Sequence, residues 1–248
     1  MRVIAADLHI HSALSPCADK DMTPETIVYA AVAAELDVIA LCDHNSAGNG
    51  AAVQEAAQDF AGPYLQVLVG MEITTAEEVH VLGLFPDARQ AQAASAEVAQ
   101  HLPLVGAAGD PYGEQLLLDA KGNRCGTVDR MLSFATDLDL NQTAALIRRY
   151  GGLVIPAHFD RPSFSITSQL GLLPENLRFD ALEITALGYV EGRHLPYLEE
   201  GHALIMNSDA HYLNDVGRAR CYFEVEEPSF GEIKRAFRRE AGRRSFLA

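Results

Sequence analysis

Residues 3–12 read VIAADLHIHS, and the fold that we expect for the chain follows from this segment. Its first half is a short apolar run typical of a buried strand, and Asp7, His9 and His11 follow at every second position. Side chains two apart in an extended chain point the same way, so both imidazole rings are placed to bind one metal ion. A lone pair of this kind is weak evidence, because a histidine at the end of a strand is usually an ordinary polar residue.

The same pattern, an apolar run followed by His, Asp or Glu, recurs along the chain. Short strands are expected at 37–42, 65–69, 79–85, 153–157, 181–184 and 203–206, with helices between most of them, as at 24–36, 50–60 and 141–150 and after the strand at 181–184 through residue 198. This alternation predicts an α/β fold with a parallel sheet, either doubly wound or closed into a barrel. Since the carboxyl ends of parallel strands share one face, we expect the polar residues there to meet. They are His9, His11, His44, Glu72, His80, His158, Asp209 and His211.

A metal centre is the simplest reason for so many polar groups at one apolar mouth. Their burial would be costly unless they were paired or coordinated. Neutral imidazoles and carboxylates are ligands for zinc, manganese and ferrous iron. The recurrence on one predicted face therefore carries more weight than any single motif.

Residues 86–140 interrupt the alternation. The stretch predicts a helix at 89–101, several glycines, and a hairpin at 114–126 that turns at 121–123. We interpret it as an insertion that decorates the barrel. No linker-like tract marks a boundary elsewhere, so we expect residues 1–248 to form a single domain.

The charge and cysteine content limit the partners. A net charge of −15 counts against long nucleic acid, which needs a basic surface, and against an anionic membrane. It leaves a small phosphorylated substrate open, because a site with several divalent cations is locally positive. No apolar run reaches the roughly 20 residues of a membrane span, and the four cysteines form no CxxC pair. We expect a cytoplasmic protein with reduced thiols and make no prediction of its oligomeric state.

The chain resembles the PHP family, which is named for polymerase and histidinol phosphatase. Its motifs stand here in the family's order as DLHIHS (7–12), DHN (43–45), GME (70–72), PAH (156–158) and SDAH (208–211). The resemblance runs through nearly the whole chain apart from 86–140. It implies a distorted seven-stranded (β/α)7 TIM-like barrel, with a cluster of two or three divalent ions (zinc, manganese or iron) at one face.

The resemblance also implies a ligand set. The first metal would be held by His9, His11, Glu72 and Asp209, and the second by Glu72, His80 and His158. His44 and His211 would help to hold a third. Asp7 would be either a weak ligand or a residue that orients a ligand by fixing a histidine tautomer, and Asp43 would have a similar orienting role.

Cys17 occupies the position where three-metal relatives carry a histidine. A thiolate binds zinc or iron well, and a small buried apolar residue is the alternative interpretation. Asp19 is a second candidate donor. If neither binds, the site holds two metals.

The function implied is hydrolysis of a phosphate ester by a metal-bridging hydroxide. We expect a phosphomonoesterase acting on a small phosphorylated metabolite or nucleotide, with Asp209 or His211 moving the proton. Arg161 is the candidate for gripping the phosphate, although a surface ion pair is an equal interpretation of one arginine.

Three alternatives remain open. The first is a metal-dependent exonuclease or phosphodiesterase that cleaves short oligonucleotides. The second is an amidohydrolase-like enzyme, although such barrels usually carry a bridging lysine and none of Lys20, Lys121 and Lys234 follows a strand. The third is a non-catalytic metal-binding module, against which the complete ligand set argues.

Overall fold

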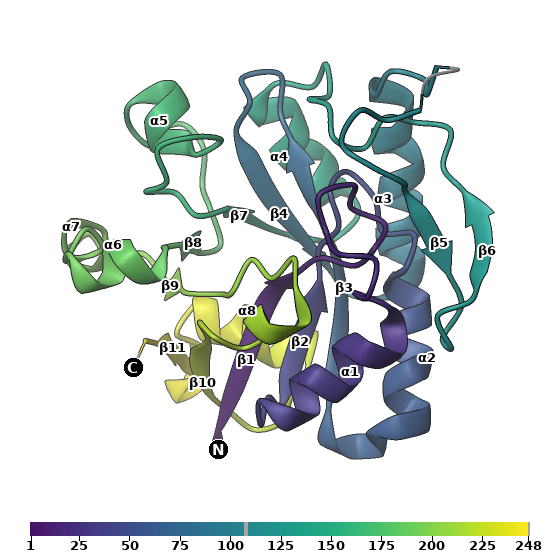
Figure 1. Ribbon diagram of the computed structural model, residues 1–248. Helices are drawn as coiled ribbons and strands as arrows, with labels where there is room; N and C mark the ends of the chain where they lie inside the picture. Colours follow the sequence, from purple (N-terminus) through teal and green to yellow (C-terminus); the bar gives the residue numbers. More distant parts are fainter. Residues whose placement is uncertain (107–108, 248) are drawn as a thin grey trace.

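The computed structural model describes residues 1–106 and 109–247. Within them the main sheet has the order β11-β10-β1-β2-β3-β4-β7, and the pairs β5-β6 and β8-β9 lie outside it (Figure 1). The strands are β1 (Arg2–Ile10), β2 (Val38–Leu41), β3 (Gln66–Thr74), β4 (His80–Phe85), β5 (Leu116–Leu118), β6 (Arg124–Thr127), β7 (Leu153–Pro156), β8 (Leu182–Glu183), β9 (Leu204–Ile205), β10 (Cys221–Val225) and β11 (Arg244–Phe246).

Helices flank this sheet on both sides. Figure 1 shows α1, α2 and α3 along one flank and α5, α6 and α7 at the opposite flank. Thr23 and Asp139 start α1 and α4 with capping boxes, which satisfy free N–H groups of the first turn. The α-helices are α1 (Pro24–Ala33), α2 (Gly50–Phe60), α3 (Ala88–Val98), α4 (Leu140–Arg149), α5 (Ile166–Leu170), α6 (Ala186–Val190), α7 (Leu195–Glu199) and α8 (Phe230–Phe237), and 3-10 turns lie at η1 (Gly62–Tyr64), η2 (Ala99–His101), η3 (Leu213–Asp215) and η4 (Glu240–Gly242).

The main sheet is mixed, which meets the expected barrel only in part. β1, β2 and β3 run parallel, but β4 is antiparallel to β3 and β7, and β10 is antiparallel to β1 and β11. Residues 75–79 join β3 to β4, and five residues are too few for the crossover that a parallel pair needs. The structure therefore has a curled α/β sheet of seven strands, whereas a regular (β/α)7 repeat is not what its hydrogen bonds describe.

Backbone hydrogen bonds hold the segments that follow β7 and β9 against the main sheet. Beside β7, the N–H of Asp180 donates to the carbonyl of Val154 at 2.9 Å. Beyond the end of β1, the N–H of His11 donates to the carbonyl of Ala210 at 3.0 Å. The segment after β9 thus lies against the end of β1, which is how residues from both halves of the chain reach one place.

The segment 86–140 contains the expected helix and hairpin. The helix is α3, and its buried residues Ala91, Ala94 and Val98 join the same apolar cluster as the strands it covers. In the hairpin β5-β6, β6 is largely exposed, whereas β5 is half-buried to buried. The hairpin turns through Gly122, whose φ of +79° suits glycine. The assignment of this segment as an insertion in a single domain stays a prediction.

A glycine explains one motif of the sheet. Gly70 sits in β3 where a Cβ atom would lie 2.7 Å from the carbonyl oxygen of Gly83 and 2.8 Å from the Cys42 sulfur. Only glycine allows this approach of β4, and the same strand then carries Glu72 to its carboxyl end. Among the described residues, none of the helices combines the length and apolar character that a membrane crossing requires.

Candidate metal centre

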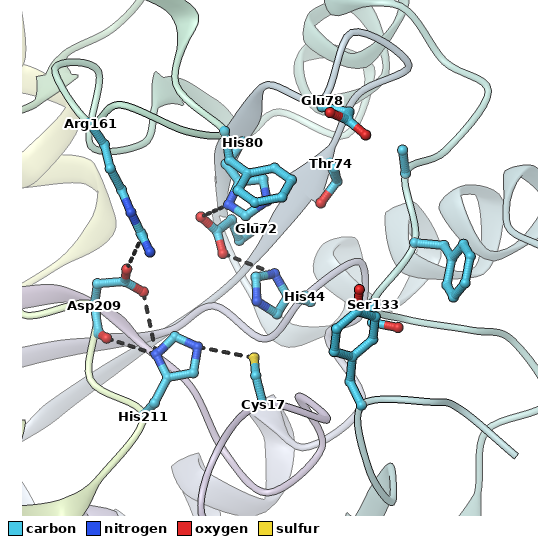
Figure 2. Close-up of a pocket in the computed structure, with 14 residues that line it drawn as sticks. Cys17, His44, Glu72, Thr74, Glu78, His80, Ser133, Arg161, Asp209 and His211 are labelled. Carbon is cyan, nitrogen blue, oxygen red and sulfur yellow. Dashed lines mark hydrogen bonds and ion pairs between the residues drawn. The ribbon is translucent and has the colours of Figure 1, made fainter. Parts of the chain in front are cut away.

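The polar residues predicted from the sequence meet around one cavity. They come from the ends of β1, β2, β3, β7 and β9 and from the start of β4. Figure 2 shows His44, His80, Asp209 and His211 around Glu72. Every predicted ligand therefore reaches this place, namely His9, His11, Cys17, His44, Glu72, His80, His158, Asp209 and His211.

Glu72 lies at the centre of the cluster, and both of its oxygens face histidine nitrogens. Its Oε1 is 2.7 Å from His80 Nδ1 and 3.1 Å from His158 Nε2. Its Oε2 is 3.0 Å from His44 Nδ1. The same oxygen lies 3.5 Å from His9 Nε2 and 3.4 Å from His11 Nε2. One carboxylate is thus placed to be shared between two cations.

The donor atoms of His9, His11, Glu72 and Asp209 all lie within 4.8 Å of one another. The two Nε2 atoms are 3.1 Å apart, and Asp209 Oδ1 is 3.5 Å from His9 and 3.2 Å from His11. In a tetrahedral zinc site with bonds of about 2.0–2.1 Å, neighbouring donors lie about 3.3–3.4 Å apart. These four side chains are therefore spaced as the ligands of one ion are.

Two further groups overlap with the first. The donors of His44, Glu72 and His80 form one, and those of His11, His44 and His211 form the other. The resemblance assigns His158 to the second metal, and its Nε2 lies next to the same Glu72 oxygen as His80. The groups share members, so any ions bound here lie side by side.

Unpaired buried atoms show that this set suits cations. Glu72 Oε2, His80 Nδ1, His158 Nδ1 and Asp209 Oδ1 are buried and have no hydrogen-bond partner among the described residues. A buried polar atom without a partner costs about 1–3 kcal/mol. Glu72 Oε2 and Asp209 Oδ1 both face the gap between His9 and His11, where a cation would satisfy them.

The charges of the cluster favour ionised carboxylates. Burial raises the pKa of Glu72, but the positive charge available on His80, His9 and His44 holds that pKa well below its usual range. Burial also raises the pKa of Asp209, but the charge of His9 and the nearby ring of His11 together hold that pKa below its usual range. Both side chains are therefore anionic donors at neutral pH.

Glu183 is a functional residue that the sequence reasoning missed. Its carboxylate accepts from His9 Nδ1 at 3.1 Å, from Asn207 Nδ2 at 2.7 Å and from the backbone N–H of His158 at 2.8 Å. A proton held on Nδ1 leaves Nε2 of His9 free to face the metal position. The sequence signal that could have revealed it is an acidic residue in the apolar run at 181–184. A buried carboxylate is costly unless it is paired, so an acid at this position indicates a partner.

Glu183→Gln is expected to weaken the affinity of the first site for its metal by roughly 10- to 100-fold. The amide cannot accept all three N–H groups, so His9 loses its fixed orientation. Competition with a chelating dye measures the affinity, and the pH dependence of binding should shift as well. Glu183→Asp, which keeps the charge, should recover part of the affinity; equal losses in both variants would mean that Glu183 only packs.

Asp7 and Asp43 were both predicted to orient the ligands, and the structure gives them different contacts. Asp43 acts on His11 through Ser15, whose Oγ lies 2.9 Å from His11 Nδ1 and donates to Asp43 at 2.8 Å. The ring of His9 is fixed by Glu183, and the prediction that Asp7 fixes a tautomer is wrong. Asp7 instead accepts from Ser208 Oγ at 2.5 Å and from Gly217 N–H at 2.9 Å, so it fastens the segment that carries Asp209.

Cys17, and not Asp19, lies beside the third group. Its sulfur is 3.1 Å from His211 Nε2 (Figure 2). The carboxylate of Asp19 instead accepts from the N–H of Asp21 at 2.9 Å. Burial would raise the pKa of the Cys17 thiol, but hydrogen bonds with His211 and His44 lower it from 9.0 to about 6.

In metal-free protein we expect Cys17 to react with iodoacetamide already at pH 7, with a midpoint near pH 6. The thiolate is the reactive form, and it predominates above the pKa. Mass spectrometry of the alkylated peptides against pH measures this. Cys125, which is also exposed, is the internal control. Protection of Cys17 by added zinc would support a ligand role, and equal reactivity of both thiols would contradict the shift.

Arg161 stands at the edge of the cavity. Its guanidinium pairs with Asp209 Oδ2 at 3.0 Å and is 43% exposed (Figure 2). Both interpretations made from the sequence are compatible with this position, since the group forms an ion pair and also faces the cavity.

The backbone is strained at the same place. Asn45, His158 and Asp209 are not glycines, yet their φ values are +51°, +30° and +52°. Such conformations cost about 1–3 kcal/mol each and collect at functional sites. Asp209 lines a cavity of about 480 Å³, a volume within the range of small-molecule pockets.

Solved structures share this fold. Endonuclease Q from Pyrococcus furiosus superposes with a TM-score of 0.73 at 21% identity, covering 99% of this chain. Endonuclease Q in complex with a 27-mer duplex with an abasic lesion at the active site gives 0.71 at 20% identity, covering 98%. This chain spans only 58% of the length of each. A two-domain protein from Bacteroides vulgatus with a predicted PHP-like metal-dependent phosphoesterase gives 0.58 at 15%, covering 99% of this chain and 65% of that one.

A comparison with curated protein sequences finds no significant match. The model of the PHP domain family, however, matches residues 7–159. That range is more than half of the chain, and it includes the ligand candidates from His9 to His158. Because this family model matches more than half of the chain, the chain belongs to the PHP domain family.

Proposed function

We propose that the chain is a metal-dependent phosphoesterase that hydrolyses monoesters of small phosphorylated metabolites or nucleotides. The observation that carries this proposal is the position of Glu72, which faces five histidines at the base of an open cavity. Membership of the PHP family supports it. The proposal includes the single domain over 1–248 with its 86–140 insertion, and the cytoplasm as compartment.

In this proposal two or three divalent ions occupy the centre, and zinc, manganese and iron all suit its donors. The first ion would be held by His9, His11, Glu72 and Asp209, the second by Glu72, His80 and His158, and the third by His44, His211 and Cys17. Bound there, the ions supply a Lewis acid that makes water acidic near neutral pH and neutralises phosphate charge.

The chain's own residues bind the ester and handle the proton. Arg161 reaches the cavity with a planar fork that matches two phosphate oxygens, and a phosphate would replace Asp209 as its partner. Burial would lower the pKa of His211, but contacts with Cys17 and Asp209 raise it. With two ions bound and His211 not a ligand, the ring would therefore be able to hold a proton for the leaving oxygen at neutral pH.

Metal analysis and a substrate panel test the proposal. Purified protein should carry two or three divalent ions per chain, and it should hydrolyse p-nitrophenyl phosphate faster than bis-p-nitrophenyl phosphate. A faster diester reaction would favour a phosphodiesterase. Metal-loaded protein without activity on either ester, or on nucleotides, would contradict the proposal.

A nuclease is the second candidate. The fold likeness to endonuclease Q favours it, and so does a groove that adjoins the cavity and is lined by Arg161, Arg193 and Arg218. Each of these arginines pairs with a carboxylate, on Asp209, Glu191 and Asp215, and the net charge of −15 weakens attraction to DNA. Cleavage of a duplex with an abasic site, at rates above those on p-nitrophenyl phosphate, would support this second candidate.

A further inference from the structure

Three exposed aromatic side chains border the cavity that holds the metal centre. They are Tyr112, Phe134 and Phe164, with exposed fractions of 67%, 38% and 40%. Phenylalanine is mostly buried in folded proteins, so two half-exposed rings beside polar donors call for an explanation. None of the three has a role in the proposed hydrolysis.

Phe164 is held in place by a residue of the metal centre. Its φ is +55°, which is unusual for a bulky side chain, and its carbonyl accepts from the N–H of His80 at 2.9 Å. Its ring stacks on that of His80, with 4.9 Å between centroids and 24° between planes. The strained backbone keeps this ring at the cavity rather than in the core.

Phe134 is fixed by the second motif of the family. The amide of Asn45 donates to the carbonyls of Leu132 at 2.8 Å and Phe134 at 3.0 Å. The Oδ1 of Asn45 also accepts from the N–H of Thr74 at 3.0 Å, which ties this loop to β3.

Tyr112 is joined to the same loop. Asp110 accepts from Ser133 Oγ at 2.7 Å and from the N–H of Tyr112 at 2.9 Å. The aromatic residues therefore line a cavity whose walls are held by hydrogen bonds before any ligand enters, and preorganised walls lose little entropy on binding.

We propose that this aromatic wall, defined as Tyr112, Phe134 and Phe164, binds the flat base of a nucleotide whose phosphate lies at the Glu72 cluster. The inference rests on the proposed function and narrows its substrate class. The volume of about 480 Å³ accommodates a mononucleotide. Stacking on aromatic rings tolerates every base, so the wall selects nucleotides over other phosphate esters and discriminates weakly among bases.

The test compares adenosine 5′-monophosphate with ribose 5-phosphate, which carries the same ester without the base. For manganese-loaded protein, kcat/KM and the Kd from titration calorimetry should both favour the nucleotide. Phe164→Leu should reduce this preference by roughly 5- to 100-fold, the range that base stacking spans. Phe164→Tyr, which keeps a ring, should retain it.

Phe60→Leu is the matched control. Phe60 is 41% exposed, like Phe164, but it lies at the end of α2 and packs on Tyr29. This variant should keep the preference of the unmodified protein. Equal preference for both esters, or the same loss in Phe164→Leu and Phe60→Leu, would overturn the aromatic wall.

The binding measurement separates the two proposals. If neither ester is hydrolysed, the proposed function fails, and tighter binding of the nucleotide that depends on the ring of Phe164 would still support the wall. If both esters are hydrolysed but bind equally, the wall fails and the phosphoesterase stands.

Discussion

Glu72→Gln is expected to lower the turnover of p-nitrophenyl phosphate by roughly a thousandfold or more, and to leave fewer than two metal ions per chain. The change removes the charge that five histidines share, and the new amide turns an N–H group toward nitrogens that must stay free as donors. Loss of an orienting contact alone typically costs about 10- to 100-fold in metal affinity or activity, so loss of a bridging ligand should cost more. Steady-state kinetics and elemental analysis of the same preparation measure both effects.

Glu232→Gln is the control for loss of a buried carboxylate. Glu232 lies on α8, away from the cavity, and is 6% exposed. Its carboxylate pairs with Arg243 at 2.8 Å. We expect this variant to be less stable but to keep the metal content and turnover of the unmodified protein. If Glu72→Gln keeps both ions and more than a tenth of the activity, the assignment of the centre is wrong.

Removal of metal should have the second large effect. Dialysis against a chelator is expected to abolish activity and to lower Tm by about 8–15 °C. Ligand present at about a thousand times its Kd stabilises by about 4 kcal/mol, and each kcal/mol moves Tm by about 2–4 °C at this chain length. Without cations, Glu72 Oε2 and Asp209 Oδ1 are buried and have no hydrogen-bond partner among the described residues, which destabilises the folded state.

Scanning calorimetry before and after chelation measures the shift, and manganese or zinc added back should reverse it. Glu72→Gln serves as the internal reference, because a protein that no longer binds the ions should show little change on chelation. An unchanged Tm in the unmodified protein, together with full activity, would rule out a structural and catalytic metal centre here.

The sequence predicted the class of fold because apolar runs and helical spacing are local properties. It predicted a parallel neighbour for β4 wrongly, although the short connection at 75–79 already excluded a crossover helix. It also predicted one helix through residue 198, where the structure breaks it into α6 and α7 at Gly192, whose φ is +75°. At both places the short connection or the glycine turn determined the structure, and the spacing of apolar residues did not.

The candidate site was predictable to a similar extent. The positions of the histidines, Glu72 and Asp209 near strand ends indicated most ligand candidates, because the carboxyl ends of parallel strands share a face. Cys17 was added only by the resemblance to the PHP family. Glu183 was missed because its role depends on which histidine lies across the interior, and no local pattern encodes that contact. Tyr112, Phe134 and Phe164 were missed for the same reason, because two loops far apart in sequence line one cavity.

Asn45 links a loop of the cavity wall to the strand that carries Glu72. It follows His44 directly, and its amide joins β3 to the loop at 132–134. A displacement of that loop would therefore be expected to move His44, the neighbouring candidate ligand, as well. Exchanging the loop at 132–134 to change substrate selectivity would therefore also change the geometry of the metal centre. Variants with altered substrate preference should keep Asn45 and its three backbone partners unchanged as one unit.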